Sequence, residues 1–162
     1  MRESDISWLK SRMNILYLVR DPKDALLSGA IAYRFGGRES EVQQDRLEDW
    51  ILNCIHEDYG WLTPIESWRN HVSGWRKHED DLTVVKYEDY IQDYEWQSRR
   101  LSRILGTSVE DTIPPLQSCT ASRKGIVGDH INHLSGRMIE FINHECREEI
   151  KWIESLREKK KC

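Results

Sequence analysis

The stretch NILYLVRDPKDALLSGAIAYRF, residues 14–35, constrains the fold more than any other part of the chain. Its run from Ile15 to Val19 is apolar at every position, which is typical of a strand buried on both faces of a parallel sheet. After Arg20 come Asp21 and Pro22, and proline fits the first helical position because that position needs no N–H bond. The stretch therefore predicts a buried strand followed directly by a helix over residues 24–35.

The rest of the chain alternates in the same way and predicts a single α/β domain over residues 1–162. A second strand is expected from Asp81 to Tyr87, where β-branched residues are frequent. Apolar side chains at helical spacing predict helices over residues 40–58, 64–77, 94–106 and 136–160. The segment 112–135, with its Pro-Pro pair and its glycines, predicts a long loop, and such loops are usually functional or disordered.

Composition and charge argue against two classes of function. The net charge of −4 and the pI near 5.9 do not suit a general nucleic-acid binder, which normally carries a basic surface. No apolar run approaches the roughly 20 residues of a membrane helix, and the charged N-terminus does not resemble a signal peptide. The cysteines form no CxxC pair and favour a reduced chain. We therefore expect a soluble, cytoplasmic protein that binds neither nucleic acid nor membrane.

Arg20 stands at the carboxyl end of the first predicted strand, where open α/β sheets place their ligands. The helix that follows would point free N–H groups and the positive end of its dipole into the same crevice. Ser28 lies about one turn inside that helix, on the same side as Asp24. A guanidinium, helix amides and a hydroxyl together suit a phosphate monoester. The alternative is that Arg20 pairs with Asp21 or Asp24 and that Ser28 has no role.

A second cationic place is the loop sequence SRKGIVGDHINH, in which Arg123 and Lys124 stand beside Gly125. Because glycine has no side chain, backbone N–H groups beside it can approach an anion closely. The alternative is a solvated pair of charges in a loop.

The same loop contains possible metal ligands, which are Asp129, His130 and His133. Two histidines three residues apart can chelate a metal from one helical turn, but the sequence shows no third strong ligand near them. We therefore expect no metal site.

Tyr87 ends the second predicted strand and would stand at the same edge of the sheet as Arg20. Its ring could stack on a nucleotide base, or it could fill the core with its hydroxyl at the rim. Glu88 and Asp89, which follow, are expected to cap the next helix rather than to act as catalysts.

Taken together and in this order, LVRDPKDALLS, VVKYEDY and RKGIVGDHINHLS resemble the sulfotransferase family that uses 3′-phosphoadenosine 5′-phosphosulfate (PAPS). The resemblance runs from about residue 14 to residue 153 and includes the pattern WRNHVSGW before the second strand. It implies a P-loop-like α/β fold with a small parallel sheet flanked by helices, truncated at the N-terminus. It also implies a set of residues that bind the 3′-phosphate and the adenine, which are Arg20, Ser28, Tyr87, Arg123, Lys124 and Gly125.

Two departures from the family pattern bear on catalysis. The chain has His130-Ile131 where the family usually has Trp-Lys. The family also carries, upstream of the first strand described here, a phosphate loop of the type Pro-Lys-Ser/Thr-Gly-Thr and often a catalytic histidine, and neither precedes Asn14. His56 is then the candidate for the catalytic base, while His71 is expected to be a partly buried structural histidine.

The resemblance implies transfer of a sulfuryl group from PAPS to a hydroxyl or amine of a small-molecule acceptor, with 3′-phosphoadenosine 5′-phosphate (PAP) as the product. This chain would supply the 3′-phosphoadenosine-binding part, without a metal. The alternative is a non-catalytic nucleotide-binding or assembly module that needs a partner for the missing phosphate loop. An exposed sheet edge would favour such a partner chain or a homo-oligomer. A kinase-like phosphotransferase is disfavoured because the chain has no G-x-x-x-x-G-K-[ST] sequence.

Overall fold

The computed structural model describes residues 13–53, 62–106, 108 and 126–158. Within these ranges the chain forms two short strands, β1 (Leu16–Val19) and β2 (Thr83–Lys86). The helices are α2 (Pro22–Tyr33), α3 (Gln44–Asn53), α4 (Pro64–Arg76), α5 (Tyr87–Gln92), α6 (Tyr94–Leu105), α8 (Gly136–Glu145) and α9 (Arg147–Glu158). Single turns of 3₁₀ helix lie at Glu39–Glu41, Glu79–Asp81 and Asp129–Asn132.

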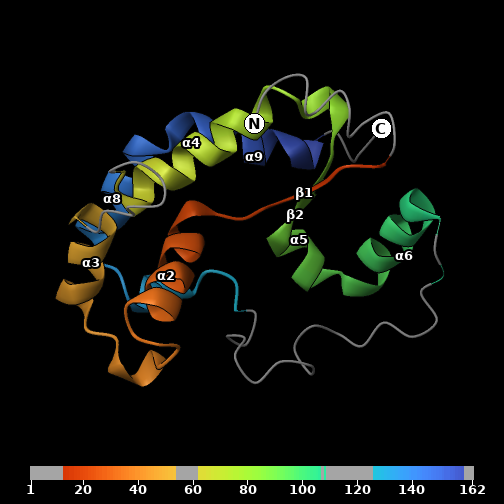
Figure 1. The fold of residues 1–162 in the computed structure, drawn as a ribbon. Coiled ribbons are helices and arrows are strands. Elements are labelled where there is room, and N and C mark those ends of the chain that lie inside the picture. The colour runs from red at the N-terminus through yellow and green to blue at the C-terminus, as the bar shows by residue number, and fades with distance from the viewer. Residues whose placement is uncertain (1–12, 54–61, 107, 109–125, 159–162) are drawn as a thin grey trace.

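The two strands pair in parallel, with Leu16 opposite Thr83 and Val19 opposite Lys86. Both strands therefore end at the same edge of the sheet, and the residues that follow them, Arg20 and Tyr87, leave from that edge. The sequence placed Tyr87 at the end of the strand, but it is the first residue of α5. In Figure 1, α4 and α9 run together along one side of the sheet, while α5 and α6 lie at the end of the molecule opposite α3 and α8.

The core has two parts. The larger cluster joins α2, α3 and α8, and its most deeply buried side chains are Leu27, Ile31, Leu47, Ile51 and Ile142. The smaller cluster packs the inner face of β1 against α4 and α9 through Tyr17, Val19, Val72, Trp152 and Ile153. Burial of these apolar surfaces is the main force that holds the helices on the sheet.

The outer face of β1 is open to solvent. Leu16 is 42% exposed and Leu18 is 54% exposed, whereas Tyr17 and Val19 on the inner face are 6% and 2% exposed. The sequence predicted a strand buried on both faces, and among the described residues this is wrong, because helices cover only one face. Strands of parallel sheets normally have cover on both faces.

Local sequence signals set most helix ends. The Asp21 side chain accepts a hydrogen bond from the Lys23 N–H and caps α2, with Pro22 in the first turn. α6 ends at Gly106, whose φ of +68° is the left-handed conformation that glycine tolerates. The predicted helix over 136–160 is instead two helices that meet at Cys146. The helix predicted over 40–58 is observed from residue 44 to residue 53, and residues 54–58 lie outside the described ranges.

In the part of the chain that the structure describes, no helix has the length and apolar character needed to cross a membrane.

Candidate functional site

The guanidinium of Arg20 lies over the ring of Tyr87, with Cζ 4.4 Å from the ring centroid. This is cation–π geometry. Its Nη2 donates a hydrogen bond to the backbone carbonyl of Ile126 at 3.4 Å. Its Nε is buried and has no hydrogen-bond partner among the described residues. Arg20 therefore joins the ends of both strands to the loop at Ile126, and its Nε donor is not used by any residue that the structure describes.

The alternative pairing of Arg20 with Asp21 or Asp24 is not what the structure contains. Asp21 accepts hydrogen bonds from Lys23, through the backbone N–H at 2.9 Å, and forms an ion pair with the Lys23 ammonium at 3.0 Å. Asp24 is engaged by the loop at 128–130. The guanidinium is thus free of both carboxylates.

Asp24 anchors this loop to the first turn of α2. Its carboxylate accepts hydrogen bonds from the Gly128 N–H at 2.7 Å and from the His130 N–H at 3.1 Å, and it contacts His130 Nδ1 at 2.8 Å. Burial alone would raise the pKa of Asp24, but the bonds from His130 and Gly128 outweigh it and lower the pKa to about 2. Gly128 adopts a φ of +81°, which suits glycine. Sequence reasoning did not identify this anchor.

Glu88 was expected to cap the helix that follows β2, but its carboxylate instead accepts a hydrogen bond from another helix terminus. Its buried Oε1 accepts a hydrogen bond from the backbone N–H of Asp21 at 2.8 Å, so it fixes the start of α5 against the start of α2. Its Oε2 is buried with no partner among the described residues. The cap residue of α5 is Lys86, whose side chain makes no capping bond.

A cavity of about 240 Å³ lies between the start of α2, the end of β2 and the loop at 127–130. Lys86 and Glu88, both almost fully buried, line it together with Asp24, Gly128 and His130. Ile150 and Ile153 of α9 complete the wall, so the cavity is small and mixed in character, with both signs of charge beside apolar surface.

Ser28 lies one turn after Asp24 on α2 and is half-buried. The structure thus brings Arg20 and Tyr87 into contact and places Ser28 further along the same helix. Arg123, Lys124 and Gly125, as well as His56, lie outside the described residues.

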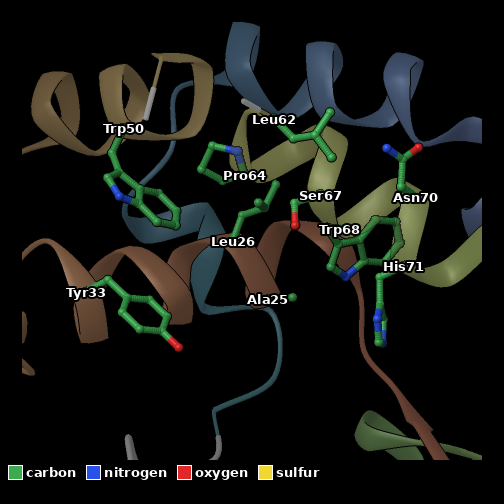
Figure 2. A pocket seen from close by; sticks show the side chains of 10 residues that line it. All are labelled: Ala25, Leu26, Tyr33, Trp50, Leu62, Pro64, Ser67, Trp68, Asn70 and His71. Carbon is green, nitrogen blue, oxygen red and sulfur yellow. The ribbon is translucent and has the colours of Figure 1, made fainter. Parts of the chain in front are cut away.

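A second, larger cavity of about 760 Å³ opens between α2 and α4 (Figure 2). Its wall is mainly apolar and aromatic, from Ala25, Leu26, Tyr33, Trp50, Leu62, Pro64, Ser67, Trp68, Asn70 and His71. Figure 2 shows the Ser67 hydroxyl directed between the two helices, with the Tyr33 hydroxyl at one end and the His71 ring at the other. Such a wall suits an apolar ring that carries a few polar groups.

His71 lines this larger cavity, and although the residue as a whole is exposed, its ring is partly covered by neighbouring aromatic side chains. Its ring contacts those of Tyr17 and Trp75, with centroid distances of 5.7 Å and 6.4 Å. Partial burial lowers the pKa of His71 below its usual value, so the imidazole is neutral at pH 7.

Comparison with known proteins gives one family match. The model of the sulfotransferase domain matches residues 4–122, which include Arg20, Ser28 and Tyr87 and end before Arg123.

Individual relatives agree with this match. A 3-alpha-hydroxysteroid sulfotransferase of Cavia porcellus is 26% identical over 161 residues, which cover 80% of this chain and 53% of the relative. Sulfotransferase 2A2 of Rattus norvegicus is 30% identical over 110 residues, which cover 64% of this chain and 35% of the relative. The chain thus spans about half, or less, of the length of these relatives.

Among solved structures, mouse sulfotransferase SULT7A1 complexed with PAP superposes with a TM-score of 0.64 at 20% sequence identity. The superposition covers 96% of this chain and 64% of the mouse chain. At this identity the likeness establishes the sulfotransferase fold alone, and the chain spans less than two thirds of the length of the mouse chain.

Proposed function

Because the chain belongs to the sulfotransferase domain family, we propose that it supplies the 3′-phosphoadenosine-binding part of an enzyme that transfers a sulfuryl group from PAPS. The acceptor is a hydroxyl or amine of a small molecule, and PAP is the product. PAP is also the molecule bound in the mouse sulfotransferase that shares this fold.

One observation carries the proposal, which is the contact of Arg20 with both Tyr87 and Ile126. The family resemblance assigns Arg20 to the 3′-phosphate and Tyr87 to the adenine. Ile126 directly follows Arg123, Lys124 and Gly125 in the sequence. Three stretches that are far apart in the chain therefore converge where a nucleotide with a 3′-phosphate would need them together.

The chemistry of Arg20 fits this role. Its Nε is a buried donor without a partner among the described residues, and a buried unsatisfied donor is costly unless a ligand satisfies it. A phosphate bound by a guanidinium fork would take up that donor in a charge-assisted bond. Ser28 and the cations of the 123–125 segment would complete the anion site, and the Tyr87 ring would pack on the adenine.

The cavity between α2 and α4 is the proposed acceptor site. Its aromatic wall suits a hydrophobic acceptor, and sulfuryl transfer mainly requires that acceptor and donor be held in line. The transfer also needs a base for the acceptor proton. His56 is the candidate from the sequence, and His71 is a second, because its neutral imidazole faces this cavity.

Binding tests the proposal directly. We expect isothermal titration to show that the chain binds PAP at least tenfold more tightly than adenosine 5′-phosphate, which lacks the 3′-phosphate. The variant Arg20→Ala should lose this preference, whereas Arg38→Ala, an exposed arginine paired with Glu41, should keep it. Equal affinity for the two nucleotides in the unmodified chain would reject the proposal.

A non-catalytic assembly module is the second candidate, and the open outer face of β1 favours it. Such a module would bind PAP but would need a partner to hold the 5′-phosphosulfate. An assay of sulfate transfer from PAPS by the chain alone separates the two candidates, since turnover without any partner is possible only for the enzyme.

A further inference from the structure

Three possible metal ligands converge on one point, and none of them is among the residues proposed to bind the nucleotide. Glu39, Asp129 and His133 each direct one ligand atom into a group whose members all lie within 4.8 Å of one another. His133 Nε2 is 3.5 Å from Asp129 Oδ2 and 3.6 Å from Glu39 Oε1. Glu39 comes from the 3₁₀ turn after α2, and the other two residues come from the turn before α8. The sequence offered no third ligand near Asp129 and His133, and the fold supplies Glu39.

The distances differ from those of an ordinary histidine–carboxylate hydrogen bond. A direct bond of this kind exists in the same loop, where His130 Nδ1 lies 2.8 Å from Asp24 Oδ1. His133 Nε2 stands well beyond that distance from both of its carboxylates. Ligand atoms about 2.1 Å from a tetrahedral Zn²⁺ lie about 3.4 Å from one another. The two distances to His133 are therefore close to the edges of such a tetrahedron.

We propose that Glu39, Asp129 and His133 bind a divalent transition-metal ion, best Zn²⁺, with water in the fourth position. An imidazole nitrogen together with two carboxylates favours zinc over magnesium or calcium, which prefer oxygen ligands alone. The ion would fit among the three ligand atoms after small movements of the side chains.

The surroundings of the ligands also suit a metal. Asp129 is oriented by its neighbour, because Asn132 Nδ2 donates a hydrogen bond to Asp129 Oδ1 at 3.0 Å, while Oδ2 lies 3.5 Å from His133 Nε2. Hydrogen bonds from neighbouring residues to the ligands orient the ligand atoms towards a metal ion. The three ligands differ in exposure: the side chain of Asp129 is 7% exposed, that of His133 20% and that of Glu39 43%. An ion can therefore enter from the Glu39 side.

Bound metal would fasten the 39–41 turn to the 129–133 segment. Gly128, which precedes this segment, and His130, which lies in it, hold Asp24 at the start of α2. The ion would thus stabilise the loop, and none of its three ligands is a residue proposed to bind the nucleotide or the acceptor. A ligand that binds only the folded state raises its stability in proportion to the logarithm of the ligand concentration over Kd.

Zinc titration of the EDTA-treated full chain tests the inference, independently of nucleotide binding. We expect isothermal titration to give one Zn²⁺ per chain, the melting temperature to rise with Zn²⁺, and Co²⁺ to give the visible absorption of a tetrahedral site. His133→Gln should weaken Zn²⁺ binding at least tenfold. His144→Gln should leave it unchanged, because His144 is a surface histidine that also contacts a carboxylate, at 3.1 Å.

If His133→Gln does not fold, Glu39→Gln provides the same comparison from an exposed position. Zn²⁺ binding of equal strength in the unmodified chain and in the ligand variant would overturn the inference. So would the absence of any Zn²⁺-dependent rise in melting temperature.

Discussion

The Arg20 guanidinium covers one face of the Tyr87 ring, with Cζ 4.4 Å from the ring centroid. The two residues follow paired strands, so the register that places Val19 opposite Lys86 also brings these side chains together. Under the proposed function, a base that packs on this ring would share it with the guanidinium that would hold the 3′-phosphate.

Tyr87 is expected to contribute to nucleotide affinity through its ring rather than its hydroxyl. Stacking of a base on an aromatic side chain is worth about 1–3 kcal/mol. Tyr87→Leu should therefore weaken PAP binding by about tenfold or more, and Tyr87→Phe should leave it within about twofold. Isothermal titration of both variants measures this. Equal losses in the two would indicate a role for the hydroxyl instead.

The buried carboxylate of Asp24 should make a large contribution to stability at neutral pH. Its pKa is lowered from 3.8 to about 2 in the folded chain, which corresponds to about 2 kcal/mol of preferential stabilisation of the charged form. The substitution Asp24→Asn should therefore lower the free energy of unfolding by about 2 kcal/mol, as measured by urea denaturation at pH 7. Asp49→Asn, on the exposed face of α3, should lose much less.

The Asp24 carboxylate also makes the stability of the folded chain depend on pH. Because the pKa of Asp24 is lower in the folded than in the unfolded chain, the unfolded state binds the proton first as the pH falls. The contribution of the Asp24 carboxylate to the free energy of unfolding is therefore complete above about pH 4–5 and is lost as the pH falls towards 2. The difference in unfolding free energy between the unmodified chain and Asp24→Asn should shrink over this window. A difference that stays constant from pH 6 to pH 3 would contradict the assignment.

The two faces of β1 should respond differently to the same kind of substitution. Val19→Ala removes buried methyl groups and should cost about 2 kcal/mol of unfolding free energy. Leu18→Ala, on the open face, should change it by less than about 0.5 kcal/mol. Urea denaturation of both variants checks the contrast. A large loss at Leu18 would show that something covers this face in solution.

The Cys146 thiol should be unreactive in the folded chain. It is fully buried, and burial, with a further contribution from the nearby Glu149 carboxylate, raises its pKa to about 12. The thiolate is the reactive form, so alkylation with iodoacetamide at pH 8 should leave Cys146 unmodified, as read by peptide mass spectrometry. In 8 M urea the same peptide should be modified within minutes. Rapid modification without denaturant would contradict the burial of this side chain.

Local patterns allowed much of the fold to be predicted. The apolar run before Arg20 gave β1, and Asp21-Pro22 gave the start of α2, because both depend on a few adjacent residues. The break at Cys146 was missed because the apolar stripe of α8 and α9 continues through it, so periodicity shows no interruption. The exposure of Leu16 and Leu18 was missed because an apolar strand predicts burial but does not show what covers it.

Contacts across long stretches of chain could not be read from the sequence. Asp24 looked like a possible partner of Arg20, yet it binds the loop at Gly128 and His130. Such choices depend on which backbone donors the fold brings within reach. The roles assigned to Arg20, Ser28 and Tyr87 remain predictions, as do those of Arg123, Lys124 and Gly125, which lie outside the described residues together with His56.

The two outward-facing leucines of β1 have a consequence for handling the protein at high concentration. They stand beside a strand edge that has no pairing partner within the described chain, and an apolar edge strand invites another polypeptide to add to it. Net charge keeps molecules apart only at long range and is weakened by salt. Solubility limits should therefore respond more to polar replacements at these two positions than to changes in buffer ionic strength.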